Sequence, residues 1–105
     1  MSGGAFNYYQ YHINTIIDDI ESVIHKNKKL IPYEELSNWE KNNYDVNNPP
    51  LYFEYSDKTI EEFKKGVNIL KQAAVYAQRI DWLLSGDDGE ETFHERLKED
   101  LSKID

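Results

Sequence analysis

The chain has 105 residues, and its 20 acidic and 12 basic side chains give a formal net charge of −8. This length suits a single domain, residues 1–105, with a real but thin core. The acidic excess disfavours general nucleic-acid binding and attachment to anionic membranes, because both surfaces attract basic proteins.

The absence of cysteine from the sequence excludes disulfides, thiolate metal sites and cysteine nucleophiles. The first residues lack the charged and apolar regions of a signal peptide, and no apolar run has the length of a membrane span. We therefore expect a cytoplasmic protein.

The chain opens with paired glycines, Gly3 and Gly4, which allow a sharp turn or a close approach of the backbone to a neighbour. Four aromatic residues follow within six positions: Phe6, Tyr8, Tyr9 and Tyr11. A flexible terminus accounts for the glycines, whereas the aromatic residues favour a segment that packs on the rest of the chain.

A first helix is predicted near residues 8–26. Its apolar positions recur at helical spacing and form one face: Ile13, Ile16, Ile17, Ile20, Val23 and Ile24. His12 and His25 lack the partners at i+4 that are typical of a zinc-binding helix, so we interpret them as ordinary surface residues.

Residues 30–55 form a long connection. Pro32 favours a short helix at its first turn, and residues 42–50 have the composition of irregular structure. Residues 51–55 are aromatic and predicted to be extended, because Pro50 disfavours a helix before it. The aromatic content of the connection predicts that it wraps around the helices.

The longest helix is predicted at 57–84, after a possible cap at Ser56 and before a stop at Ser85 and Gly86. Two adjoining apolar stripes predict that this helix packs on two partners. The first stripe includes Ile60, Phe63, Val67, Leu70, Ala74, Ala77 and Leu84, and the second Ile69, Ala73, Tyr76, Ile80 and Leu83.

The fold class that follows is all-α, a small bundle of about three helices with a long irregular connection between helices 1 and 2. Leu70 is predicted to be buried in the core. Gly66 marks either a close helix crossing or a tolerated weak point.

Asp81 interrupts the first apolar stripe. An unpaired buried carboxylate is costly, so Asp81 should be paired or hydrogen-bonded, or else it lines a pocket or contact surface. If the first and longest helices are antiparallel, Gly3, Gly4 and Phe6 meet this end of the long helix. A parallel arrangement stays open, because the connection is long enough to allow it.

The last helix is predicted at 90–104, with Asp88 and Glu91 as a pair resembling a capping box. Residues 80–95 contain six acidic residues and no lysine or arginine. Their spacing does not match a calcium-binding loop, and the chain has neither a nucleophile elbow nor a phosphate loop. We therefore expect no enzyme activity, no metal and no cofactor.

Two segments resemble a set of small proteins encoded in bacterial, phage and prophage genomes. The residues that carry the resemblance are 2–8, with the sequence SGGAFNY, and 82–93, with the sequence WLLSGDDGEETF. The resemblance implies a genomic setting and not an activity. Small acidic proteins in that setting often bind host or defence components, which implies a regulator, an inhibitor or an anti-defence factor.

The first functional hypothesis is therefore a small acidic protein-interaction module that binds a basic protein surface. The alternative is a binder of a small anionic, nucleotide-like ligand without catalysis. A homodimer is also expected, because many aromatic residues accompany a small core. The candidate binding residues are Gly3, Gly4, Phe6, Tyr9, Asp81, Trp82, Ser85, Gly86, Asp87 and Glu91.

Overall fold

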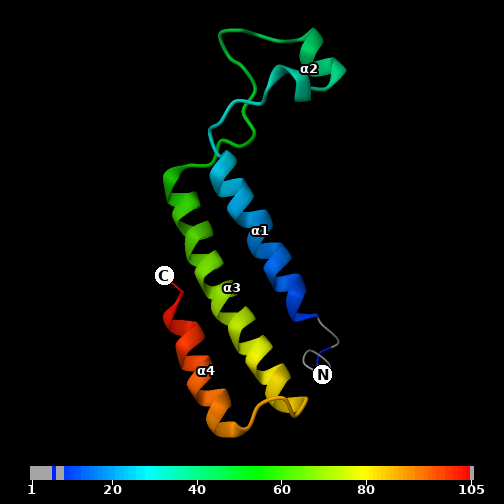
Figure 1. Ribbon diagram of the computed structural model, residues 1–105. Coiled ribbons are helices and arrows are strands. Elements are labelled where there is room, and N and C mark those ends of the chain that lie inside the picture. Colours follow the sequence, from blue (N-terminus) through cyan, green and yellow to red (C-terminus); the bar gives the residue numbers. More distant parts are fainter. Residues whose placement is uncertain (1–5, 7–8, 105) are drawn as a thin grey trace.

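The computed structural model describes Phe6 and residues 9–104 of the chain. These residues form α1 (Gln10–Lys26), α2 (Asn38–Asn42), α3 (Asp57–Leu84) and α4 (Glu90–Ser102), with a 3₁₀ turn, η1, at Tyr33–Glu35 (Figure 1). Extended pairing within this part of the chain is limited to two isolated bridges. The all-α prediction is confirmed, and α3 has the predicted bounds.

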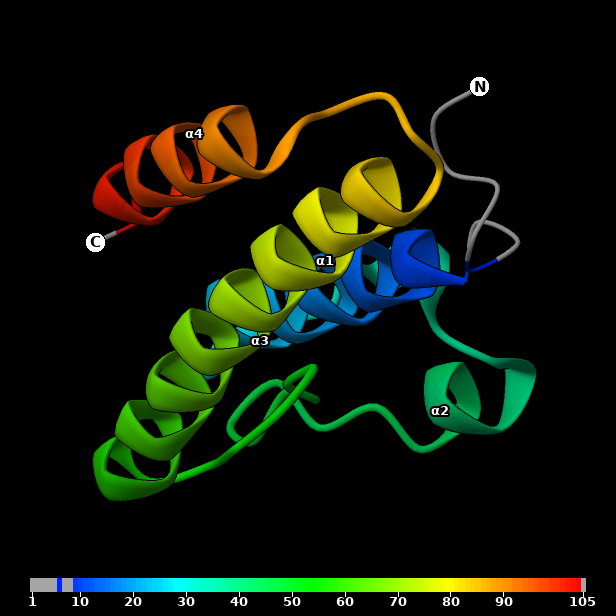
Figure 2. The same ribbon diagram turned by 90° about the horizontal axis from the view of Figure 1, so that it is seen from below.

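Helix α3 packs against both of the other long helices, α1 and α4, as predicted for a helix with two partners. Helix α1 runs antiparallel beside α3, and α4 returns along another side of α3 (Figures 1 and 2). The molecule measures 61 × 27 × 15 Å, so the bundle is elongated and not compact. No helix among the described residues is long and apolar enough to cross a membrane.

Both ends of α3 carry the predicted signals. The hydroxyl oxygen of Ser56 accepts a hydrogen bond from the Thr59 amide at 3.3 Å, which satisfies one of the unpaired donors of the first turn. At the other end Gly86 has φ +82°, a left-handed conformation that glycine adopts without steric cost.

The connection does not wrap around the helices, and that prediction is wrong. Its two ends pair with each other: the Lys28 amide donates to the Phe53 carbonyl at 2.7 Å, and the Tyr52 amide donates to the Lys29 carbonyl at 3.0 Å. Because this neck holds both ends together, residues 30–50 extend beyond the hairpin as an arm that carries α2 (Figure 1).

The core is thinner than predicted. Among the described residues, its buried apolar side chains are Ile17, Leu36, Ile60 and Val67. Leu70 is only half-buried, so that prediction is wrong; it lies beside the line of contact with α1, which runs through Ile60 and Val67. A Cβ atom added at Gly66 would meet nothing within 4 Å, so Gly66 marks no close crossing within this chain.

The second apolar stripe of α3 is not covered by α4. Ile69, Ala73 and Tyr76 on this stripe are exposed. Helix α4 lies instead on the side of α3 where Arg79 binds Asp100 with an Nε–Oδ2 distance of 2.7 Å. This ion pair links α4 to that side of α3.

Candidate functional site

The candidate site is the junction where the chain enters α1 and leaves α3. Helix α3 ends in a Schellman motif, in which the Asp87 amide donates to the Trp82 carbonyl at 2.9 Å and the Gly86 amide donates to the Leu83 carbonyl at 3.2 Å. These bonds satisfy the last carbonyls of α3 and turn the chain toward α4. The sequence Ser85-Gly86 therefore ends the helix as predicted.

Asp81 is fully buried at this junction, with 0% of the residue exposed. Its Oδ2 accepts a hydrogen bond from Gln10 Nε2 at 2.9 Å. Its Oδ1 accepts from the Phe6 backbone amide at 3.3 Å and from Ser85 Oγ at 3.5 Å. Hydrogen bonds to a carboxylate are stronger than neutral ones, so donors from both sides of the junction compensate for the burial of Asp81.

This arrangement confirms that the first and longest helices are antiparallel. The predicted meeting of Phe6 with Asp81 is observed, with a backbone amide as the donor. Gly3 and Gly4, for which the same role was predicted, lie outside the described residues. Tyr9 is 65% exposed, and its ring contacts His12 edge-on at 5.7 Å between centroids.

Sequence reasoning missed Gln10, the closest side-chain partner of Asp81. The signal was available, because Gln10, Ile17 and Ile24 are spaced by seven residues and so lie on one face of α1. Gln10 and Ile17 are the two buried residues of α1. A glutamine in phase with a buried isoleucine is a natural partner for a buried carboxylate.

A second cluster fixes the turn between α3 and α4. The Asp88 carboxylate, only 3% exposed, lies 3.7 Å from Arg79 Nη1 and 3.6 Å from Arg96 Nη1. The Arg79 guanidinium also lies 4.3 Å from the centroid of the Trp82 ring, a distance at which a cation is attracted by the ring. Trp82 is half-buried in this cluster.

The predicted capping box of Asp88 and Glu91 is wrong. The N-cap residue of α4 is Gly89, and no side chain caps this helix. The Asp88 carboxylate does not cap α4, because it pairs with two arginines. Two of the six acidic residues between 80 and 95 are therefore structural, and four are exposed: Asp87, Glu90, Glu91 and Glu95.

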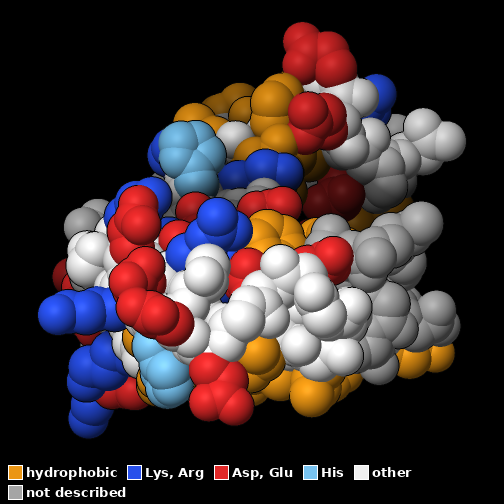
Figure 3. All heavy atoms as spheres, turned by 60° about the horizontal axis from the view of Figure 1, so that its bottom comes forward, with side chains coloured by type: hydrophobic (Ala, Val, Ile, Leu, Met, Phe, Trp, Pro, Cys, Tyr) orange, Lys and Arg blue, Asp and Glu red, His pale blue; other side chains and the backbone are white. Residues whose placement is uncertain are grey.

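We call these four residues the acidic corner. Figure 3, in which the lower end of the molecule comes forward, shows acidic side chains at the top of the view with hydrophobic side chains beside them, and charged side chains of both signs on the left. Within the described part of the chain, Glu90, Glu91 and Glu95 enter no ion pair. Their charges are therefore available to a partner.

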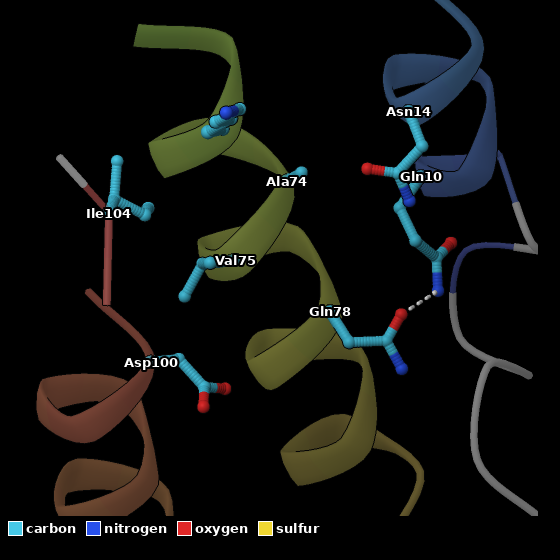
Figure 4. Close-up of a pocket in the computed structure, with 8 residues that line it drawn as sticks. Gln10, Asn14, Ala74, Val75, Gln78, Asp100 and Ile104 are labelled. Carbon is cyan, nitrogen blue, oxygen red and sulfur yellow. Dashed lines mark hydrogen bonds between the residues drawn. The ribbon is translucent and has the colours of Figure 1, made fainter. Parts of the chain in front are cut away.

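Beside the junction lies a hollow of about 320 Å³ between α1, α3 and α4 (Figure 4). The residues that line it are Gln10, Asn14, Lys71, Ala74, Val75, Gln78, Asp100 and Ile104. Gln10 Nε2 donates to Gln78 Oε1 across it at 3.4 Å. The lining holds one lysine and one aspartate but no aromatic ring, so it offers little to a nucleotide base.

Among the described residues, no group of three or more histidine or acidic side chains is placed to hold one metal ion. Comparison of the chain with family models, with curated proteins and with solved structures finds no match.

Proposed function

We propose that this chain is a small protein-interaction module of the cytoplasm, without catalytic activity, that binds a basic protein surface through the acidic corner. The observation that carries the proposal is the set of four exposed carboxylates at one end of the bundle. The regulator, inhibitor or anti-defence role implied by the resemblance is one form that such binding takes.

Rigidity of the corner supports the proposal. The Schellman motif fixes the backbone on one side of Asp87, and the pairing of Asp88 with Arg79 and Arg96 fixes it on the other. Charges on a fixed scaffold bind a complementary surface at a lower entropic cost than charges on a mobile loop.

Location of charge also supports it. Residues 80–95 contain no lysine or arginine, and Arg96, which follows them, pairs with Asp88. The basic segment His25–Lys29 lies at the other end of the α1–α3 hairpin, beside the neck (Figure 1). A basic partner is therefore attracted to one end of the molecule.

The test compares two variants that lose the same charge. The first removes the corner through Asp87→Asn, Glu90→Gln, Glu91→Gln and Glu95→Gln. The control removes four exposed carboxylates elsewhere through Asp18→Asn, Asp19→Asn, Glu34→Gln and Glu54→Gln.

Proteins captured from the source cells by the wild type are then measured against both variants at increasing salt. We expect the corner variant to lose a basic partner that the control retains, with wild-type binding weakening as salt rises. Equal capture by both variants would contradict the proposal. A rise in melting temperature with a nucleotide, and no protein partner, would favour the small-ligand alternative.

A further inference from the structure

The α1–α3 hairpin has an apolar side that no long helix of the described chain covers. None of its residues lines the hollow between α1, α3 and α4. We call it the apolar face, and its residues are Tyr9, Ile13, Ile16, Ile20 and Val23 of α1, with Phe63, Gly66, Leu70, Ala73, Ala77 and Ile80 of α3. Ile16 at its centre is 48% exposed, and Ile69 beside it is 65% exposed.

Two shallow hollows lie on this face, one at each end of the hairpin. One of about 420 Å³ is lined by residues that include Ile13 and Ala77, and one of about 310 Å³ by residues that include Ile20 and Gly66. Glu62 is the one charged residue among those that line them. The net charge of −8 is therefore carried elsewhere, and a partner selected by charge gains little on this face.

We propose that the apolar face binds a second copy of this chain, so that α1 and α3 of two copies form a four-helix core. This surface is separate from the acidic corner, so the proposal does not depend on the proposed function.

The shape of the face favours a second copy over another partner. Helix α1 contributes a ridge of large side chains, Ile13, Ile16 and Ile20. Helix α3 contributes small residues, Gly66, Ala73 and Ala77, with the half-buried Leu70 between Gly66 and Ala73. An added Cβ at Gly66 would meet nothing within 4 Å, so the space over Gly66 is open in the single chain. A face with both a ridge and small residues is complementary to itself under a two-fold axis.

The ridge and the small residues lie at similar heights. The Gln10–Gln78 bond of 3.4 Å and the Glu21–Lys71 ion pair of 3.5 Å set the register of the hairpin. Ile16 lies midway between these levels, at the height of Ala74 and one residue from Ala73. A two-fold axis parallel to the helices therefore places the α1 ridge of each copy over the small α3 residues of the other.

The chain exposes more surface than a compact monomer of its mass. The chain exposes 7685 Å², about 1,500 Å² more than the roughly 6,100 Å² expected for a compact monomer of 12.4 kDa. A standard interface buries about 800 Å² on each partner. The projecting arm accounts for part of this excess, and the apolar face, where Ile16 is 48% exposed, accounts for another part.

The first experiment measures the mass in solution by sedimentation equilibrium over a range of concentrations. We expect twice the 12.4 kDa of one chain. Ala73→Glu, an exposed position on the face, should raise the dimer dissociation constant by about 100-fold or more, because each copy then buries an unpaired charge. Gln72→Glu, an adjacent exposed position off the face with the same charge change, should leave the mass unchanged.

The proposal is overturned by a wild type that stays at 12.4 kDa at every concentration, or by equal effects of Ala73→Glu and Gln72→Glu. It is equally overturned if the monomeric wild type binds neutral lipid vesicles or another protein through this face. Circular dichroism of Ala73→Glu checks that the monomer keeps its helices.

A second experiment does not rely on weakening the dimer. The sequence has no cysteine, so any disulfide that forms must join the introduced cysteines. Chains with Ile16→Cys are mixed with chains with Ala73→Cys and oxidised, and the control mixture replaces the second variant with Gln72→Cys. We expect a mixed disulfide only in the first mixture. Equal cross-linking in both mixtures contradicts this arrangement of the α1 ridge on α3.

Discussion

Replacement of Asp81 by asparagine tests whether the buried junction is a structural clasp. The change keeps the size of the side chain and removes its charge. Asp81 is 0% exposed, so no partner contacts it while the chain is folded. We therefore expect Asp81→Asn to lower stability and to leave partner binding unchanged at temperatures where the chain is folded.

The magnitude follows from the two shorter hydrogen bonds, from Gln10 Nε2 at 2.9 Å and from the Phe6 amide at 3.3 Å. A hydrogen bond to a charged group contributes about 1 kcal/mol more than a neutral one, so loss of the charge weakens the pair by about 2 kcal/mol. Gln10 Oε1 has no hydrogen-bond partner among the described residues, so rotation of the Gln10 amide lets it accept from the amide introduced at position 81 and limits the loss.

Asp81→Ala should cost more, about 2–6 kcal/mol, because two neutral donors then lose their acceptor at about 1–3 kcal/mol each. Thermal and urea unfolding followed by far-ultraviolet circular dichroism measures both changes. For a domain of this size 1 kcal/mol corresponds to about 4–8 °C in melting temperature. The control is Asp18→Asn on the exposed side of α1, which should change stability by no more than about 0.5 kcal/mol.

The reasoning is refuted if Asp81→Asn melts at the wild-type temperature, or if Asp18→Asn is equally destabilising. Loss of partner binding by a fully folded Asp81→Asn chain would show instead that the junction is itself a functional surface.

Arg79→Ala should destabilise the chain by about 3 kcal/mol, because it leaves the 3% exposed Asp88 carboxylate with a weaker partner; hydrogen exchange should show that α4 loses protection first. Ile17→Ala should cost about 2–5 kcal/mol in urea unfolding, and Leu70→Ala less, because Ile17 is 5% exposed and Leu70 is half-buried. A hydrogen bond from Tyr52 to the Glu35 carboxylate raises the pKa of Tyr52 above 10.0. Because this raised pKa favours the protonated form, the contact stabilises the arm below pH 10.0 and is lost as pH rises through the folded pKa; an absorbance titration should show Glu35→Gln lowering that pKa.

The long helices were predictable because their signals are local. The 3.6-residue period, the cap at Ser56 and the left-handed Gly86 each act within one or two turns of the chain. The arm was not predictable from such signals. Its neck depends on Asn27, whose side chain accepts from the Tyr55 amide at 2.9 Å and donates to the Tyr55 carbonyl at 3.0 Å. The Asn27 side chain replaces a backbone partner for a residue 28 positions away. Such a contact leaves no periodic pattern in the sequence.

The candidate site was predictable in part for the same reason. An aspartate in an apolar stripe must have donors, and this reasoning, together with the condition that the helices are antiparallel, predicted the junction of α1 and α3. It did not identify Arg79 and Asp88, because the two residues are nine positions apart and belong to different elements. Only the turn of the chain at Gly86 brings them together.

Periodicity shows that a stripe is apolar, but it does not show what covers the stripe. Helix α4 has its own apolar residues at Phe93 and Leu97, and on that basis either side of α3 is an acceptable place for it. The ion pair of Arg79 with Asp100 favours the charged side of α3, because an arginine that is 12% exposed needs its carboxylate on the same side. With α4 on the charged side of α3, the stripe of Ile69, Ala73 and Tyr76 stays exposed in the part of the chain that the structure describes.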